Sequence, residues 1–227
     1  MALTVLGIDS AGPGASAAIV RGSHVLATRR RRAERGQAEI LMPMIAETLA
    51  AAGLEIATLD AIAVAVGPGS FTGLRIAIAA ARGLAVASGV PAVGISSFAA
   101  IAAQVPPGDS EAALLVALDT RRDDFYLQLF DPAHRAIGQA ALLPGTAVAS
   151  WLPHRRIRLT GDAAARLAPF LAGREAALVP GVDQVRAEDV ARLAGEILAT
   201  GQSPPPPRPV YLRAPDTTAP RLASLPR

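Results

Sequence analysis

Residues 61–89 read Ala61-Ile-Ala-Val-Ala-Val-Gly-Pro-Gly-Ser-Phe-Thr-Gly-Leu-Arg-Ile-Ala-Ile-Ala-Ala-Ala-Arg-Gly-Leu-Ala-Val-Ala-Ser-Gly89, and they carry the clearest structural pattern in the chain. Its first six residues form a short, continuous apolar run, which is typical of a strand covered on both faces. Gly67, Pro68 and Gly69 end that strand. An apolar helix is then expected from about Thr72 to the glycine at 89. The stretch therefore predicts a strand, a tight glycine turn and a long buried helix.

The turn itself has two interpretations. Exposed N–H groups at a helix start attract anions, so the turn could hold a phosphate. However, Leu74-Arg75 stands where a Walker loop needs lysine and a hydroxyl residue, and the glycine spacing also departs from the dinucleotide pattern. In the other interpretation, Ser70 or Thr72 caps the helix and Gly73 lets strand and helix approach closely. The residue pattern leaves both open.

The same alternation of strands and helices extends along the whole chain. In the first half we expect strands at residues 3–9, 15–20, 24–28, 61–66 and 91–95, with helices at 37–52, 72–87 and 96–104. In the second half we expect strands at 112–118, 125–130, 136–142, 156–160 and 176–179, with helices at 146–152, 163–171 and 187–200. The halves approximately repeat, so the prediction is an α/β protein with domains at 1–105 and 106–203, then a Pro-rich spacer and docking tail at 204–227.

Composition excludes several kinds of chemistry. The 227 residues include no cysteine and no lysine, which rules out disulfides, thiolate zinc sites, Schiff bases and a P-loop lysine. Because every basic residue is arginine, a sequence pI near 10.4 accompanies a net charge of only +3 and is poor support for nucleic-acid binding. We find no signal segment and no uninterrupted membrane-length run, so a cytoplasmic protein is expected.

Two short loops are candidates for phosphate binding. Asp9-Ser10 follows the first strand, and Asp119-Thr120 occupies the matching place in the second half. Actin-like and sugar-kinase-like ATPases hold a metal and nucleotide phosphates with a carboxylate in such a position. Alternatively, Asp9 only caps a turn, and Asp119 belongs to a solvated turn with local ion pairs.

Other chemistry finds little support in the sequence. His24, His134 and His154 have no spacing typical of a metal pair, and no serine elbow motif occurs, so we expect no metal site and no catalytic residue. The basic run Arg29–Arg35 could contact RNA phosphates or could be a solvated loop.

The two helices of the first half carry more apolar surface than one sheet face needs. Small residues along the second helix would let another helix approach closely. We therefore expect a partner interface formed by Leu41, Met44, Ile45, Leu49, Ile76, Ala77, Ala80 and Leu84.

The stretch Val66–Arg75 resembles the signature of the TsaB (YeaZ) family of bacterial tRNA-modification proteins. The signature-turn residues are Gly67, Pro68, Gly69, Ser70, Phe71, Thr72, Gly73 and Arg75. The likeness covers the whole chain, because further motifs follow in the right order at Arg35–Glu39, Leu41–Pro43, Gly89–Ser97, Ala117–Arg122 and Pro209–Pro215.

This resemblance implies two duplicated RNase H-like domains of the actin-like ATPase superfamily. It also implies a non-catalytic scaffold subunit that forms a heterodimer with TsaD, or a homodimer when alone. The complex, which includes TsaE, transfers threonylcarbamoyl to the adenine beside the anticodon of ANN-decoding tRNAs. ATP and Mg²⁺ are then expected at the level of the complex and not on the isolated chain, and tRNA is contacted through the complex.

Two departures from the pattern of catalytic relatives bear on activity. Gln37 stands where relatives often keep a lone histidine, and Asp9-Ser10 is followed by the small-residue turn Ala11–Gly14. The loops at Asp9 and Asp119 are therefore interpreted as vestigial. The alternative is an actin-like ATPase or a peptidase that acts on its own.

Overall fold

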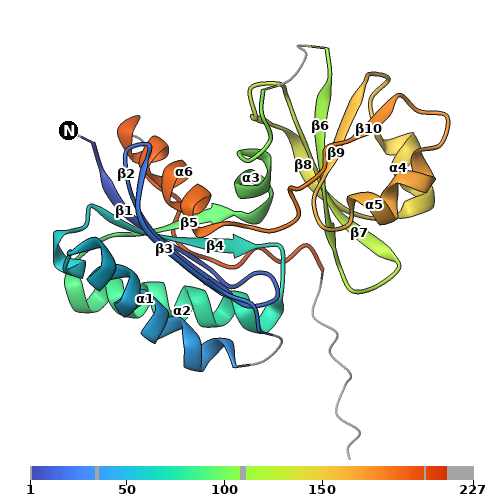
Figure 1. Ribbon diagram of the computed structural model, residues 1–227. Coiled ribbons are helices and arrows are strands. Elements are labelled where there is room, and N and C mark those ends of the chain that lie inside the picture. The colour runs from blue at the N-terminus through green and yellow to red at the C-terminus, as the bar shows by residue number, and fades with distance from the viewer. Residues whose placement is uncertain (1, 34–35, 108–110, 202, 214–227) are drawn as a thin grey trace, which may run out of the picture.

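The computed structural model describes residues 2–33, 36–107, 111–201 and 203–213. Within these ranges the chain forms two five-stranded sheets with helices packed around them (Figure 1). Arg35 of the basic run, part of the expected linker at 108–110 and the tail at 214–227 lie outside the described residues.

The first sheet is built around the strand that the opening stretch predicted. Its strands are β1 (Thr4–Asp9), β2 (Ala15–Arg21), β3 (His24–Arg31), β4 (Ala61–Gly67) and β5 (Ala92–Ser96), in the order β3-β2-β1-β4-β5. The first three form an antiparallel meander, whereas β4 pairs in parallel with both β1 and β5. Every residue of β1 and β4 is buried, as expected for central strands with both faces covered.

The second sheet repeats this arrangement. Its strands are β6 (Ala113–Asp119), β7 (Asp124–Phe130), β8 (Ala136–Pro144), β9 (Ile157–Thr160) and β10 (Ala176–Leu178). Their order, β8-β7-β6-β9-β10, again places a meander beside two parallel strands. The prediction of two copies of one α/β unit is confirmed.

Helices cover both faces of the first sheet. α1 (Gln37–Ala52) and α2 (Phe71–Ser88) lie side by side on one face, and α6 (Ala187–Ala199) lies on the other (Figure 1). α3 (Ser97–Ala102) packs between the two sheets. α4 (Gly145–Trp151), α5 (Ala164–Leu167) and the short 3-10 turn Ala168–Leu171 cover the second sheet, and another such turn is at Ile56–Thr58.

The position of α6 corrects the expected domain boundary. This helix falls within the range 106–203 that was assigned to the second domain, yet Val190, Ala191 and Ala194 pack against the first sheet. The close approach depends on Gly7, because a Cβ there would lie 2.0 Å from the carbonyl oxygen of Ala187. The first domain is thus completed by a helix from near the end of the chain.

Half of the expected interface residues lie in the interior. Leu41, Met44, Ile45 and Ala77 are buried in the core between the helices and the first sheet, so they cannot form a partner surface. Leu49, Ile76, Ala80 and Leu84 are only partly buried and pack against the same core. The apolar faces of α1 and α2, which the sequence analysis assigned to a partner, pack against the strongly apolar first sheet instead.

Pro43 lies inside α1, beyond its first turn, and its side chain is exposed.

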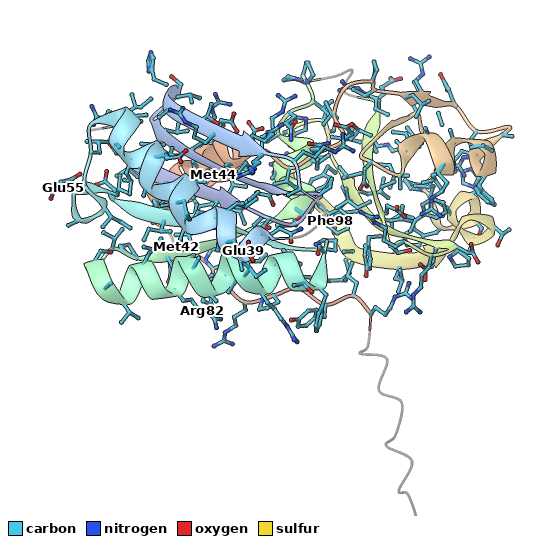
Figure 2. All side chains as sticks on the ribbon, turned by 60° about the horizontal axis from the view of Figure 1, so that its bottom comes forward. Glu39, Met42, Met44, Glu55, Arg82 and Phe98 are labelled. Carbon is cyan, nitrogen blue, oxygen red and sulfur yellow. The ribbon has the colours of Figure 1, made fainter. Side chains whose placement is uncertain are left out.

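One helix in the described ranges, α2, is long and apolar enough to cross a membrane by length and composition alone. Core helices pass the same test, and here α2 packs along β4 and carries Arg75 and Arg82. Figure 2 views α1 and α2 from outside, with Met42 labelled on the first helix and Arg82 on the second.

Candidate functional site

A cleft of about 420 Å³ lies between the two domains. Three segments that the sequence singled out line it together: the loop after β1 at Ala11–Pro13, the signature turn at Pro68–Phe71, and the loop after β6 at Asp119–Arg122. The crossing segment Asp183–Val185, Tyr126, Asp162 and Arg213 also line it. The duplication thus brings its two equivalent loops to one cavity.

The two loops have the same hydrogen bonds. Asp9 Oδ1 accepts from the N–H of Ala11 at 2.9 Å, and Asp119 Oδ1 accepts from the N–H of Arg121 at 3.0 Å. The next residue in each loop, Ser10 or Thr120, donates its hydroxyl to a carbonyl oxygen four residues later at 2.9 Å. The matching hydrogen bonds support the prediction from the sequence that the two loops are equivalent.

In the second loop the carboxylates are held by arginines. Asp119 Oδ1 accepts from Arg166 at 2.8 Å, and both oxygens of Asp124 contact Arg213 at 2.5 and 2.6 Å. Partial removal from water opposes ionisation of Asp124, but bonds from Thr120 and Arg213 prevail and lower its pKa. These groups form a structural network that ties residue 213 to the second domain.

In the first loop Asp9 is buried, with only 6 % of its surface exposed. Its burial raises the pKa from the ordinary 3.8 to about 7, although the N–H of Ala11 and the positive charge of Arg30 act in the opposite direction. A small cavity of about 40 Å³ lies beside it, lined by Ser16 and by Arg30. The Asp9 carboxyl is therefore poised between its two protonation states near neutral pH.

Asp9→Asn should remove a measurable pH dependence of stability. Between about pH 4 and pH 7 folded Asp9 keeps a proton that the unfolded chain releases, so the free energy of unfolding falls as pH rises. The slope approaches about 1.4 kcal/mol per pH unit. Urea unfolding of both proteins across this range gives the measurement.

Subtracting the stability of Asp9→Asn from that of the wild type removes the contributions of the other titrating groups. One of these is His134, whose pKa is lowered by burial. We expect Asp9→Asn to be the more stable protein above about pH 7, since the amide oxygen can still accept from Ala11. A stability difference that stays constant across the pH range would contradict the assignment.

The signature turn packs directly on the first loop. The N–H of Ser70 donates to the carbonyl oxygen of Ala11 at 2.7 Å, and a Cβ on Gly73 would lie 1.9 Å from the carbonyl oxygen of Ser10. Ser70 is also the helix cap, because its hydroxyl accepts from the N–H of Gly73 at 3.3 Å. Of the two expected capping residues, Ser70 therefore has this role.

These contacts bear on nucleotide binding. Asp9 is buried beneath the turn, Asp119 is paired with Arg166, and the N–H groups of Ser70 and Gly73 have partners within the chain. A Mg²⁺–nucleotide complex needs accessible carboxylates and free N–H donors. The two loops as they stand therefore do not fit such a complex.

A second cavity, of about 440 Å³, opens where the last described residues cross the domain junction; we call it the junction pocket. Residues 203–213 run along the first domain, where Gly94 donates to Pro205, Arg82 to Pro207, and Val210 to Val66. Tyr211 then packs on Phe71 with ring centroids 5.7 Å apart. The full lining is Pro68, Gly69, Phe71, Leu74, Arg75, Tyr126, Val210, Tyr211, Leu212 and Arg213.

The histidines and the described residues of the basic run, which the sequence offered as candidates, do not line the cleft or the junction pocket. Within the described residues, no group of three or more His, Asp or Glu side chains could hold a metal ion. His24 and His154 are exposed on different domains. Arg29–Arg32 lie exposed on the edge strand β3 and just after it, where Arg30 is 4.0 Å from Glu188.

Sequence reasoning missed the site residues Tyr126 and Asp162. Tyr126 lines both cavities, and Asp162 accepts from the N–H of Asp119 at 2.8 Å. No local pattern marks these residues, because they reach the junction only through the pairing of β6, β7 and β9. Tyr211 and Arg213 did have a signal, since they belong to the motif at Pro209–Pro215.

Comparison with known proteins agrees with this architecture. The family described as "TsaD: tRNA N6-adenosine threonylcarbamoyltransferase" matches residues 26–154. An uncharacterized protein of Mycobacterium tuberculosis is 36 % identical over 217 residues, covering 94 % of this chain and 93 % of the relative. The tRNA threonylcarbamoyladenosine biosynthesis protein TsaB of Escherichia coli is 27 % identical over 220 residues, covering 93 % and 95 %.

Solved structures give the same result. YeaZ from Pseudomonas aeruginosa superposes with a TM-score of 0.77 at 28 % identity, covering 92 % of this chain and all of that one. A ROK hexokinase from Thermus thermophilus, at 16 % identity and a TM-score of 0.51 over 84 % of this chain and 99 % of its own, shares the fold alone. The duplicated fold, the signature turn and these relatives together show that the chain belongs to the TsaB (YeaZ) family.

Proposed function

We propose that this chain takes part in the biosynthesis of threonylcarbamoyladenosine in tRNA, as a non-catalytic scaffold that forms a heterodimer with TsaD. The E. coli relative named for this pathway aligns with nearly the whole chain, which supports the pathway. The match to the TsaD family itself supports a partner of similar fold, because related folds often pair through equivalent surfaces. Catalysis, ATP and Mg²⁺ then belong to the complex, which also includes TsaE and contacts the tRNA.

The observation that carries this proposal is the outer face of α1 and α2. Val86 is 87 % exposed and Met42 is 44 % exposed. Along the helices both have small exposed neighbours, and the exposed charges of Glu39 and Arg82 also lie close to them in sequence. We call this surface the outer helix face; it consists of Met42, Ala46, Ala50, Ala79, Gly83 and Val86. Small exposed residues on two adjacent helices let helices of a partner approach closely, and exposed apolar side chains gain from being covered.

The outer helix face replaces the interface expected from the sequence. Four residues of the expected set are buried in the core and the other four are partly buried, whereas the residues of the outer helix face are exposed on the same two helices. When TsaD is absent, the same face is proposed to pair with a second copy of this chain.

Val86→Glu should weaken the heterodimer by about thirtyfold, corresponding to about 2 kcal/mol. The new carboxylate is solvated in the free chain but would lose its water in an apolar contact. Met42→Glu should have a similar effect from the neighbouring helix. Calorimetric titration of the full chain with TsaD from the same cell measures the dissociation constant, and restored tRNA modification reports on function.

Leu178→Glu provides the matched control, because Leu178 is also exposed but lies on β10 of the second domain. Ile45→Asp is unsuitable, since Ile45 is buried and its replacement would unfold the first domain. Wild-type affinity in both helix variants would refute the outer helix face. Transferase activity from the chain without TsaD would refute the non-catalytic role.

An ATPase that acts alone is the second candidate. The convergence of two equivalent loops at one cleft favours it, whereas the burial of Asp9 and the pairing of Asp119 with Arg166 count against it. This candidate requires binding of ATP with Mg²⁺ to the pure chain, and loss of that binding on Asp119→Ala or Asp9→Ala. Absence of binding in the wild-type chain would exclude it.

A further inference from the structure

The junction pocket has the features of a binding site that no part of the proposed scaffold role yet uses. Its volume of about 440 Å³ lies in the range of ordinary ligand pockets. Phe71 and Tyr211, which line it, are 51 % and 49 % exposed. Large aromatic side chains that are half exposed around a cavity are typical of surfaces that a partner covers.

Arg75 gives the pocket an uncompensated positive charge. Its guanidinium lies 3.6 Å from the centroid of the Phe71 ring, and its Nε donates to the hydroxyl of Tyr211 at 3.1 Å. No carboxylate of the described residues forms an ion pair with it, whereas Arg213 across the pocket is paired with Asp124. The terminal nitrogens of Arg75 therefore remain available to an anionic group.

The pocket is also continuous with the outer helix face. Phe71 and Arg75 begin the exposed side of α2, which continues through Ala79 to Val86. The two motifs that resemble the TsaB family most distinctly, at Val66–Arg75 and Pro209–Pro215, meet here in their described parts. A partner that covers α2 would thus reach the pocket at one end of its footprint.

We propose that the junction pocket anchors a segment of the partner that bears an aromatic or aliphatic side chain next to a carboxylate. The apolar side chain enters between Phe71, Tyr126 and Tyr211, and the carboxylate pairs with Arg75. This inference rests on the proposed heterodimer and adds a second contact to it. Because the pocket has walls from both domains, such an anchor would also hold the domains at one angle.

The arrangement of the rings favours a side chain over a nucleotide base. One face of Phe71 is covered by the Arg75 guanidinium, and the rings of Phe71 and Tyr211 are tilted by 39°. A base is held best on an open, flat ring face. Here a compact apolar group fits the tilted walls better.

Titration of the full chain with purified TsaD tests the anchor. Phe71→Ala and Arg75→Glu should each raise the dissociation constant about tenfold or more. The effect of Arg75→Glu should shrink at high salt, which a merely structural role would not produce. Tyr211→Phe, which removes only the hydroxyl, should stay within about twofold of the wild type.

Two controls match these changes. Leu178→Ala removes an equally exposed apolar side chain, and Arg155→Glu reverses an exposed charge, both in the second domain. Thermal unfolding of each variant checks the fold. If wild type and pocket variants bind TsaD equally well, the anchor is refuted while the heterodimer stands; if the wild type does not bind, both fall. If excess ATP displaced TsaD from the wild type but not from Phe71→Ala, the pocket would bind a nucleotide and not a partner side chain, and the inference would be overturned.

Discussion

Gly73→Ala is expected to lower the free energy of unfolding by more than about 4 kcal/mol, which is exceptional for the addition of one methyl group. The new Cβ would lie 1.9 Å from the carbonyl oxygen of Ser10, and that atom belongs to backbone that cannot swing aside. The clash would separate the signature turn from the loop after β1. Urea unfolding followed by circular dichroism measures the loss.

Gly83→Ala is the matched control on the same helix. A Cβ at position 83 meets no atom within 4 Å, so the change should stabilise α2 by about 0.5–1 kcal/mol through helix propensity. If both variants changed stability by the same amount, close packing against the loop after β1 would not explain the glycine at position 73.

Gly7→Ala is expected to have the second largest effect, a loss of more than about 3 kcal/mol. Here the added Cβ would lie 2.0 Å from the carbonyl oxygen of Ala187, at the first residue of α6. The helix would be lifted from β1, and Val190 would lose its place in the core. Hydrogen exchange should show early loss of protection in α6, together with a lower midpoint of urea unfolding.

Gly195→Ala tests the same contact between α6 and β1, with the change made on the helix. The nearest atom to its Cβ would be Val5 Cγ2 at 3.9 Å, which is an ordinary contact, so stability should hold or rise slightly. Unchanged stability in Gly7→Ala would show that α6 does not depend on close contact with β1.

The order and bounds of most elements could be predicted from the sequence because each is encoded locally. The apolar run at 61–66 specified β4, and Gly53 and Gly89 marked the ends of α1 and α2. The return of α6 to the first sheet could not be predicted this way. Its apolar face does not indicate which sheet it covers, and the close contact with Gly7 that its position requires involves a residue far away in sequence.

The site was predicted in part, for a similar reason. Asp9 and Asp119 end the apolar runs of β1 and β6, so their equivalence could be recognised from position. Which residues of α1 and α2 stay exposed could not be predicted, because apolar content alone does not distinguish Ile45, in the core, from Val86, in solvent. The junction pocket needs residues from α2, β7 and the chain end together, and no single window of sequence contains them.

The return of α6 makes the first domain discontinuous, and this affects how the chain folds during synthesis. Residues 4–96 leave the ribosome first, but the part of one sheet face that α6 covers stays open until residues 187–199 have emerged. The second sheet, made entirely from residues 113–178, is complete before then. The second domain, although translated later, can therefore finish folding first. The first domain is completed only when α6 has been synthesised and packs onto its sheet.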